Sequence, residues 1–192
     1  MIWRMILWTI LAALCGSLPL AYWIGRSALG VDIRHYGDGN PGAINVWRAG
    51  GRGWFVIALL LEFLKGAIPI WLARAWGGLE GWSLLPPVLA APLGHAFSPF
   101  LGFRGGKAIA VTFGVWSGWT LWQVPLLLGA IFTLLLRLTP PEARAVRNGI
   151  LVLVLLLALA ALLRQVSWAL PTAALGHAAL LIWKARSHSE LQ

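Results

Sequence analysis

The sequence predicts an all-α integral membrane protein. Hydrophobic residues make up 59% of its 192 positions and charged residues only 11%, and the mean hydropathy is +0.79, a composition outside the range of soluble globular domains. The apolar residues form long runs separated by short polar segments, as expected for membrane helices, each of which needs about 20 apolar residues. No linker or change of composition divides the chain, so we expect residues 1–192 to form a single domain.

Seven apolar stretches are predicted to form the membrane helices. In chain order they are residues 5–24, 54–76, 82–101, 108–122, 124–138, 148–163 and 166–183. The first is nearly long enough to span a bilayer and no small-residue cleavage site follows it, so we interpret it as a retained helix and not as a signal peptide. The fourth is short for a bilayer, which predicts a short or tightly packed helix.

The distribution of basic residues predicts the orientation of the chain. Eleven Lys and Arg residues fall on one side of the seven stretches and three on the other, while Lys65 lies inside a stretch. The eleven are Arg26, Arg34, Arg48, Arg52, Arg104, Lys107, Arg137, Arg144, Arg147, Lys184 and Arg186, and the three are Arg4, Arg74 and Arg164. Because cytoplasmic loops carry the excess of Lys and Arg, we expect the N-terminus outside and the C-terminus in the cytoplasm.

The net charge of +9 and the thirteen tryptophans do not indicate a nucleic-acid-binding protein. The basic residues are scattered between apolar runs instead of forming one basic face. Many tryptophans lie at the ends of the predicted spans, which is typical of the aromatic belts at membrane interfaces. We therefore predict the lipid bilayer, and no nucleic acid, as a partner.

Two polar loops rich in glycine fall on the predicted cytoplasmic side. Residues 37–48 carry glycines that allow positive φ, together with side-chain hydrogen-bond donors, and residues 102–107 read Gly-Phe-Arg-Gly-Gly-Lys. Consecutive N–H groups in a glycine turn bind anions, and Arg or Lys adds charge-assisted hydrogen bonds. We predict that the loops converge on a phosphate group; the alternative is a pair of tight turns with cationic side chains that only anchor the protein at the interface.

Two further features are polar side chains within apolar stretches. Glu62 and Lys65 are three positions apart on one helical face, and such residues are usually paired and turned inward. They indicate either a substrate path or a structural ion pair. His95 and His177 are more typical of hydrogen-bonded packing residues than of ligands or bases.

No metal or cofactor site is expected from the sequence. Cys15 is the only cysteine, and the histidines lack metal-ligand spacing. The chain also lacks a Gly-x-Ser-x-Gly nucleophile elbow and a Walker motif.

Four motifs together resemble the bacterial membrane acyltransferases that use acyl phosphate to acylate glycerol 3-phosphate. Residues 16–19 read Gly-Ser-Leu-Pro, and residues 37–48 are similar to the family pattern Gly-Ser-Gly-Asn-x-Gly-Ala-Thr-Asn-x-x-Arg. Residues 62–69 resemble an acidic, Lys-Gly and proline segment, and residues 94–107 resemble a Gly-His and Gly-Gly-Lys motif.

This chain departs from the family pattern at several positions. Asp38 stands where the family has Ser, and Ile44 where it has Thr, so two hydroxyl groups are absent from the first loop. A C-terminal His-Arg-x-Asn motif aligns with Ala185, Arg186 and His188 and is poorly preserved. We expect Asp38 to weaken phosphate binding unless Arg48 or Lys107 compensates its charge.

The resemblance implies seven membrane helices in the inner membrane of a bacterium, with an active site that faces the cytoplasm. It implies transfer of an acyl group from acyl phosphate to glycerol 3-phosphate, with lysophosphatidate and phosphate as products and no cofactor, metal or protein partner. The expected catalytic residues are Lys107, Arg48, Asn45 and His95; the expected substrate-binding residues are Gly37, Asp38, Gly39, Asn40, Gly42, Arg104, Gly105 and Gly106; and Glu62 and Lys65 support them. Two alternatives stay open: a non-catalytic relative that binds an anionic head group, and a transporter that uses the Glu62–Lys65 pair.

Overall fold

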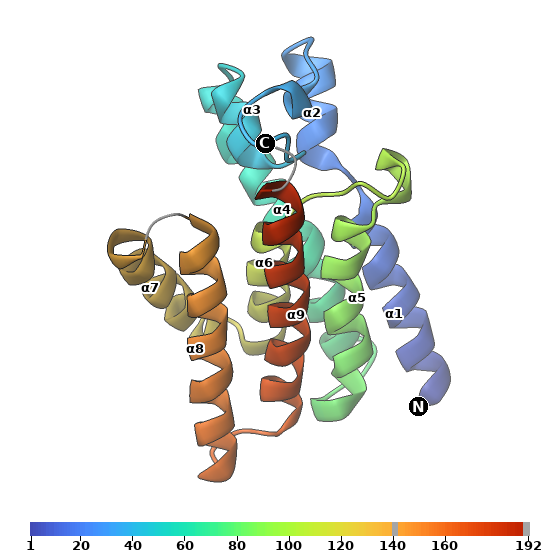
Figure 1. The fold of residues 1–192 in the computed structure, drawn as a ribbon. Coiled ribbons are helices and arrows are strands. Elements are labelled where there is room, and N and C mark those ends of the chain that lie inside the picture. Colours follow the sequence, from blue (N-terminus) through green and yellow to red (C-terminus); the bar gives the residue numbers. More distant parts are fainter. Residues whose placement is uncertain (140–141, 190–192) are drawn as a thin grey trace.

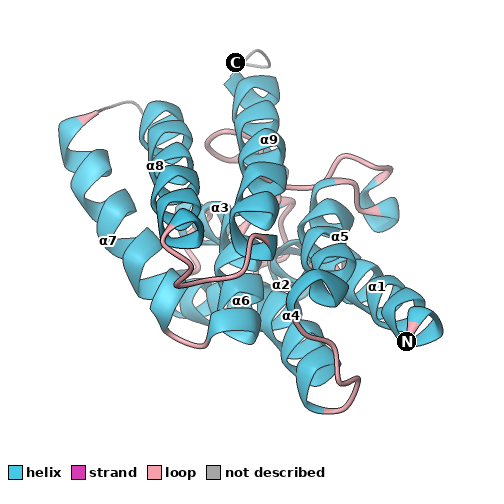
Figure 2. Cartoon of the chain, turned by 90° about the horizontal axis from the view of Figure 1, so that it is seen from below, coloured by secondary structure: helices cyan, strands magenta, loops and turns pink. Residues whose placement is uncertain are grey.

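The structure, a computed structural model, describes residues 1–139 and 142–189, and helices form all of the regular secondary structure in these ranges (Figures 1 and 2). The α-helices are α1 (Ile2–Ser17), α2 (Leu20–Ala28), α3 (Ala43–Arg48), α4 (Arg52–Ala75), α5 (Leu85–Ala96), α6 (Ile109–Thr120), α7 (Gln123–Leu138), α8 (Glu142–Leu162) and α9 (Ala169–Ser189). Three short 3-10 helices are η1 (Ile33–His35), η2 (Gly81–Leu84) and η3 (Pro99–Leu101). The predicted all-α architecture is confirmed.

Each of the seven apolar stretches coincides with helical structure, but the helices differ in their ability to cross a bilayer. Within the described residues, four segments are long and apolar enough to span: Ile2–Ala28, Arg52–Ala75, Gly81–Leu101 and Arg144–Leu162. The predicted fourth span corresponds to α6, which has only 12 residues. The number of seven spans and their orientation therefore stay predictions.

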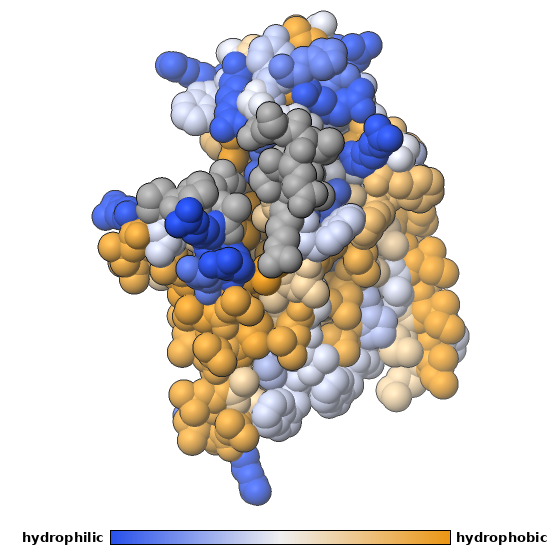
Figure 3. All heavy atoms as spheres, viewed as in Figure 1, coloured by the Kyte–Doolittle hydropathy of each residue, from blue (hydrophilic) through white to orange (hydrophobic). Residues whose placement is uncertain are grey.

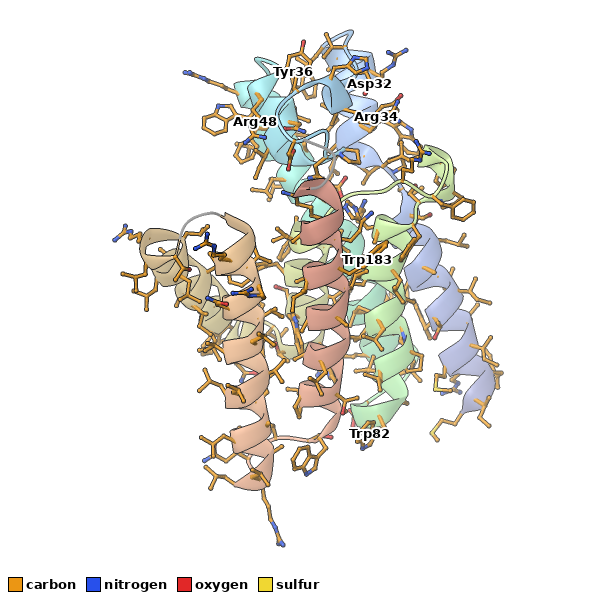
Figure 4. The ribbon with its side chains drawn as sticks, in the orientation of Figure 1. Asp32, Arg34, Tyr36, Arg48, Trp82 and Trp183 are labelled. Carbon is orange, nitrogen blue, oxygen red and sulfur yellow. The ribbon has the colours of Figure 1, made fainter. Side chains whose placement is uncertain are left out.

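The helices place the two glycine loops at the same end of the molecule. In Figure 1 the chain runs upward in α1, downward in α4, upward in α5 and downward in α6, so the loops before α4 and before α6 both lie at the top, while the N-terminus lies at the bottom. The top of the molecule is hydrophilic, and the body below it is mostly hydrophobic (Figure 3). The labelled Arg48 and Trp82 mark these opposite ends (Figure 4).

Glycines let two pairs of helices pack closely. On α6, a Cβ added to Gly114 would collide with the carbonyl of Phe63 on α4, and on α5 a Cβ added to Gly94 would collide with the carbonyl of Ala13 on α1. Small residues at such contacts allow helix backbones to approach each other in a membrane, where dispersion contacts drive association. These pairs, α4 with α6 and α1 with α5, hold the upper loops in place.

The prediction of one continuous helix over residues 5–24 is wrong. The helix ends at Ser17, and α2 begins at Leu20. Pro19 has no N–H to continue the ladder, and the backbone groups released by the break find partners elsewhere. Hydrogen bonds from the Ser98 hydroxyl to the Ser17 carbonyl (2.6 Å) and from the Ala21 N–H to a side-chain oxygen on α4 (3.1 Å) satisfy two of them.

Candidate active site

The first glycine loop has a backbone that other residues would strain. Gly37 and Gly39 have φ values of +56° and +70°, in the left-handed region that favours glycine. A Cβ on Gly37 would collide with the guanidinium of Arg48 and lie 2.6 Å from Oδ1 of Asn45. Glycine at this position therefore allows the loop to approach the side chains of α3.

Asn45 holds the loop and Arg48 together from the interior. Its side chain is 1% exposed, and its Nδ2 group donates hydrogen bonds to Oδ1 of Asp38 (3.0 Å) and to the carbonyl of Asn40 (2.9 Å). Its Oδ1 accepts a hydrogen bond of 3.0 Å from Nη1 of Arg48. Asn45 thus orients both the loop and the cation.

The two loops meet at Lys107. The backbone N–H of Lys107 donates to Oδ1 of Asn40 (3.0 Å), and its ammonium group lies 2.7 Å from Oδ2 of Asp38. The predicted convergence of the loops is therefore present in the structure. Arg104 is exposed, and among the described residues no ion pair or side-chain hydrogen bond joins it to this junction.

Asp38 is held as a carboxylate by its neighbours. Burial alone would raise its pKa, but the hydrogen bond and charge of Lys107, with the hydrogen bonds from Asn40 and Asn45, lower the pKa below its usual value. Nη1 of Arg48 lies 3.6 Å from Oδ1 of Asp38 as a second positive charge. Both cations named as possible compensators of Asp38 therefore face it.

The ion pair predicted on α4 is present, and it caps the broken helix. Glu62 and Lys65 are each 2% exposed at the side chain, and Lys65 Nζ lies 2.6 Å from Oε2 of Glu62. Lys65 also donates to the carbonyl of Leu18, while Oε1 of Glu62 accepts the N–H of Ala21. The pair thus binds both backbone groups that the break at Pro19 leaves without a helical partner.

The same carboxylate positions His95 beneath the second loop. Nδ1 of His95 lies 3.1 Å from Oε2 of Glu62, which favours the neutral tautomer with its proton on Nδ1 and a free lone pair on Nε2. A Cβ added to Gly106 would lie 2.5 Å from that Nε2, and one added to Gly105 would collide with the His95 carbonyl. The unprotonated nitrogen of His95 therefore faces the loop that carries Lys107.

Lys184 is a part of this region that sequence reasoning missed. Its ammonium group is buried and donates a 2.9 Å hydrogen bond to the carbonyl of Gly105, and it lies 5.7 and 5.4 Å from the ring centres of Phe97 and Trp183. Those two rings stack on each other at 5.3 Å. In the sequence, Lys184 served only as one of the basic residues that set topology; its place directly before the C-terminal motif was the available signal.

Other candidates lie apart from the loops or outside the description. His177 is buried in the bundle, where Nε2 lies 3.2 Å from the carbonyl of Val88 and its ring meets Trp116 edge-on, so it acts in packing as expected. The side chains of Arg186 and His188, which align with the C-terminal motif, lie outside the described residues.

The fold and the site define an integral membrane protein of helices with a cationic pair of glycine loops at one end. Its composition and the apolar lower body support the membrane class, and the donors around Asp38 define a site for anionic groups. The chain belongs to the glycerol-3-phosphate acyltransferase family, whose model matches residues 6–191.

Several curated relatives carry the same description. The chain is 49% identical over 106 residues to glycerol-3-phosphate acyltransferase 1 of Deinococcus radiodurans, a match that covers 55% of this chain and 52% of that protein. It is 44% identical over 119 residues to the glycerol-3-phosphate acyltransferase of Desulfovibrio desulfuricans, with 62% and 53% covered. The chain thus spans about half the length of the curated relatives it matches.

Solved structures resemble the chain over nearly its whole length. The glycerol 3-phosphate form of PlsY, an integral membrane glycerol 3-phosphate acyltransferase, aligns with a TM-score of 0.84 and 31% identity, covering 97% of this chain and 90% of that one. Its lysophosphatidic acid form gives a TM-score of 0.83 and 30% identity, with the same coverage. The expected family and membrane fold are confirmed.

Proposed function

We propose that this protein transfers a fatty acyl group from acyl phosphate to the 1-hydroxyl of glycerol 3-phosphate. The products are lysophosphatidate and inorganic phosphate, as in the first step of phospholipid synthesis. The junction of the two glycine loops at Lys107, directly above His95, is the observation that carries this proposal. The family match and the fold shared with an integral membrane glycerol 3-phosphate acyltransferase support it.

In this proposal the loops bind the phosphate groups of the substrates. Lys107 and Arg48 supply positive charge, and Asn40 and Asn45 fix the loop on which the phosphate lies. The glycine backbones at 37, 39, 42, 105 and 106 let a ligand approach N–H donors closely. Holding both substrates in reacting geometry can lower the barrier by about 7 kcal/mol or more.

The chemical step needs no covalent intermediate. The hydroxyl oxygen of the acceptor attacks the acyl carbonyl carbon, the new ester bond forms, and the bond between that carbon and the phosphate oxygen breaks. His95, with a lone pair on Nε2 and Glu62 on the other side of its ring, would accept the hydroxyl proton. The departing phosphate is the alternative acceptor of that proton, and Lys107 stabilises the negative charge that develops on it.

We further propose that the site faces the cytoplasm of a bacterial inner membrane. The excess of basic residues on the side of the two loops supports this orientation, because cytoplasmic loops carry such an excess. A charged, water-soluble acceptor would then reach the loops from the cytoplasm, while the apolar helices below them hold the acyl chain in the bilayer. The family match does not favour the alternatives of a non-catalytic lipid binder or a transporter.

The test is a reconstitution with defined substrates. Purified protein in micelles is incubated with palmitoyl phosphate and glycerol 3-phosphate, and phosphate release and lysophosphatidate are measured together. We expect both products in equal amounts and a loss of about 10²–10³ in rate for Lys107→Ala, the effect typical of removing one stabilising donor. Arg26→Ala, which removes an exposed cation at the end of α2, is the matched control and should keep full activity. The enzyme assignment would be wrong if the protein formed no more lysophosphatidate than Lys107→Ala.

A further inference from the structure

Asp38 occupies the place in the loops that an anionic ligand would take. Its Oδ1 accepts hydrogen bonds from the backbone N–H of Asn40 (3.3 Å) and from Asn45 (3.0 Å), and it lies 3.6 Å from Arg48. Its Oδ2 lies 2.7 Å from the ammonium group of Lys107. One backbone amide, one side-chain amide, one guanidinium and one ammonium form a donor set of the kind that binds phosphate.

We propose that Asp38 is a specificity-determining residue that competes with the acceptor's phosphate for Lys107 and Arg48. This inference rests on the proposed function, because it concerns the same pair of loops. A bound phosphate must take Lys107 from Asp38, so anionic acceptors bind more weakly than the two cations alone would allow. The chain thereby reduces its preference for phosphorylated acceptors over neutral polyols of similar size.

The charges in the loops give the reason. Arg48 and Lys107 contribute two positive charges to the junction, and the Asp38 carboxylate cancels one of them. A phosphate dianion beside a carboxylate is repelled, and the repulsion is stronger in a half-buried site than in water, because the local dielectric constant is lower. Removing the negative charge should therefore strengthen phosphate binding.

Asp38→Asn is the substitution that isolates the charge. An asparagine keeps a side-chain oxygen for the N–H of Asn40 and the amide of Asn45, so the turn retains its hydrogen bonds. Asp32→Asn is the matched control: Asp32 is also a loop carboxylate paired with a cation, Arg34, at 2.6 Å, and the described contacts do not join it to Lys107. Thermal unfolding of each variant checks that it is folded.

The experiment measures the dissociation constant of inorganic phosphate by titration calorimetry in micelles. We expect Asp38→Asn to bind phosphate at least tenfold more tightly than the wild type, and Asp32→Asn to bind it as the wild type does. The gain should disappear in the double variant Asp38→Asn/Lys107→Ala. Equal affinity of the wild type and Asp38→Asn, or an equal gain in Asp32→Asn, would overturn the inference.

Turnover gives a second readout with two acceptors. The ratio of kcat/KM for glycerol 3-phosphate to that for glycerol should rise at least tenfold in Asp38→Asn, and an unchanged ratio would contradict a role in specificity. Failure of the proposed function looks different. In that case no variant forms an acylated product, and Lys107→Ala leaves the phosphate affinity of both the wild type and Asp38→Asn unchanged.

Discussion

Glu62→Gln should destabilise the protein strongly, because one carboxylate serves three partners. Lys65 lies 2.6 Å and His95 3.1 Å from its Oε2, the Ala21 N–H donates to its Oε1 at 3.1 Å, and its side chain is 2% exposed. Gln can still accept from Ala21, but it leaves the ammonium group of Lys65 buried without a counter-charge. Breaking a buried pair in this way costs about 3–5 kcal/mol.

The assay for this prediction is reversible unfolding by a denaturing detergent, followed by tryptophan fluorescence. The loss should be partly recovered in Glu62→Gln/Lys65→Met, since that double variant removes the uncompensated charge. Glu80→Gln is the control, because Glu80 is exposed, and its free energy of unfolding should change by no more than about 0.5 kcal/mol. If the double variant is less stable than Glu62→Gln alone, the pair does not act as we describe.

Three further predictions concern packing, loop position and pH. Gly114→Leu should lower the free energy of unfolding by about 3 kcal/mol or more, since its side chain would collide with the Phe63 carbonyl, whereas Gly53→Leu, which meets open space, should not. Lys184→Met should raise the KM for glycerol 3-phosphate about tenfold by releasing the second loop, with Lys184→Arg close to the wild type, and equal kinetics of both variants would contradict this role. The hydrogen bond from its arginine partner lowers the pKa of Asp32 from 3.8 to about 2, so its contribution to stability is present above about pH 4 and is lost as the pH falls toward 2. Solvent screening limits this contribution to at most about 1 kcal/mol, and acid titration of the unfolding free energy of Asp32→Asn against the wild type measures it.

The sequence was sufficient to predict the helices and the end at which the loops lie. Apolar runs mark membrane helices because lipid cannot hydrogen bond to the backbone, and alternation of the basic residues orders the connections. The positions of residues 37–48 and 102–107 on one side followed from that alternation, and their contact through Asn40 and Lys107 is present in the structure. The catalytic roles of these residues stay predictions.

The break at Pro19 and the place of Lys184 depend on contacts between distant segments. The apolar run continues through Pro19, and prolines occur within membrane helices, so residues 5–24 alone do not distinguish a kink from a break. The break is stabilised by Glu62 and Lys65, which lie more than 40 residues away in the sequence. Lys184 likewise meets Gly105 only because of the rotation and position of α9, which periodicity does not determine.

The most direct test of the central claim, that the two loops form one catalytic site, is a double-mutant cycle on acyl transfer. The kcat/KM for glycerol 3-phosphate is measured for the wild type, Asn40→Ala, Lys107→Ala and the double variant, with palmitoyl phosphate as donor. Because Asn40 holds the backbone of Lys107, we expect the double variant to be no worse than about threefold below the weaker single variant. Losses that multiply in the double variant would mean that the two residues act independently, and would contradict the account.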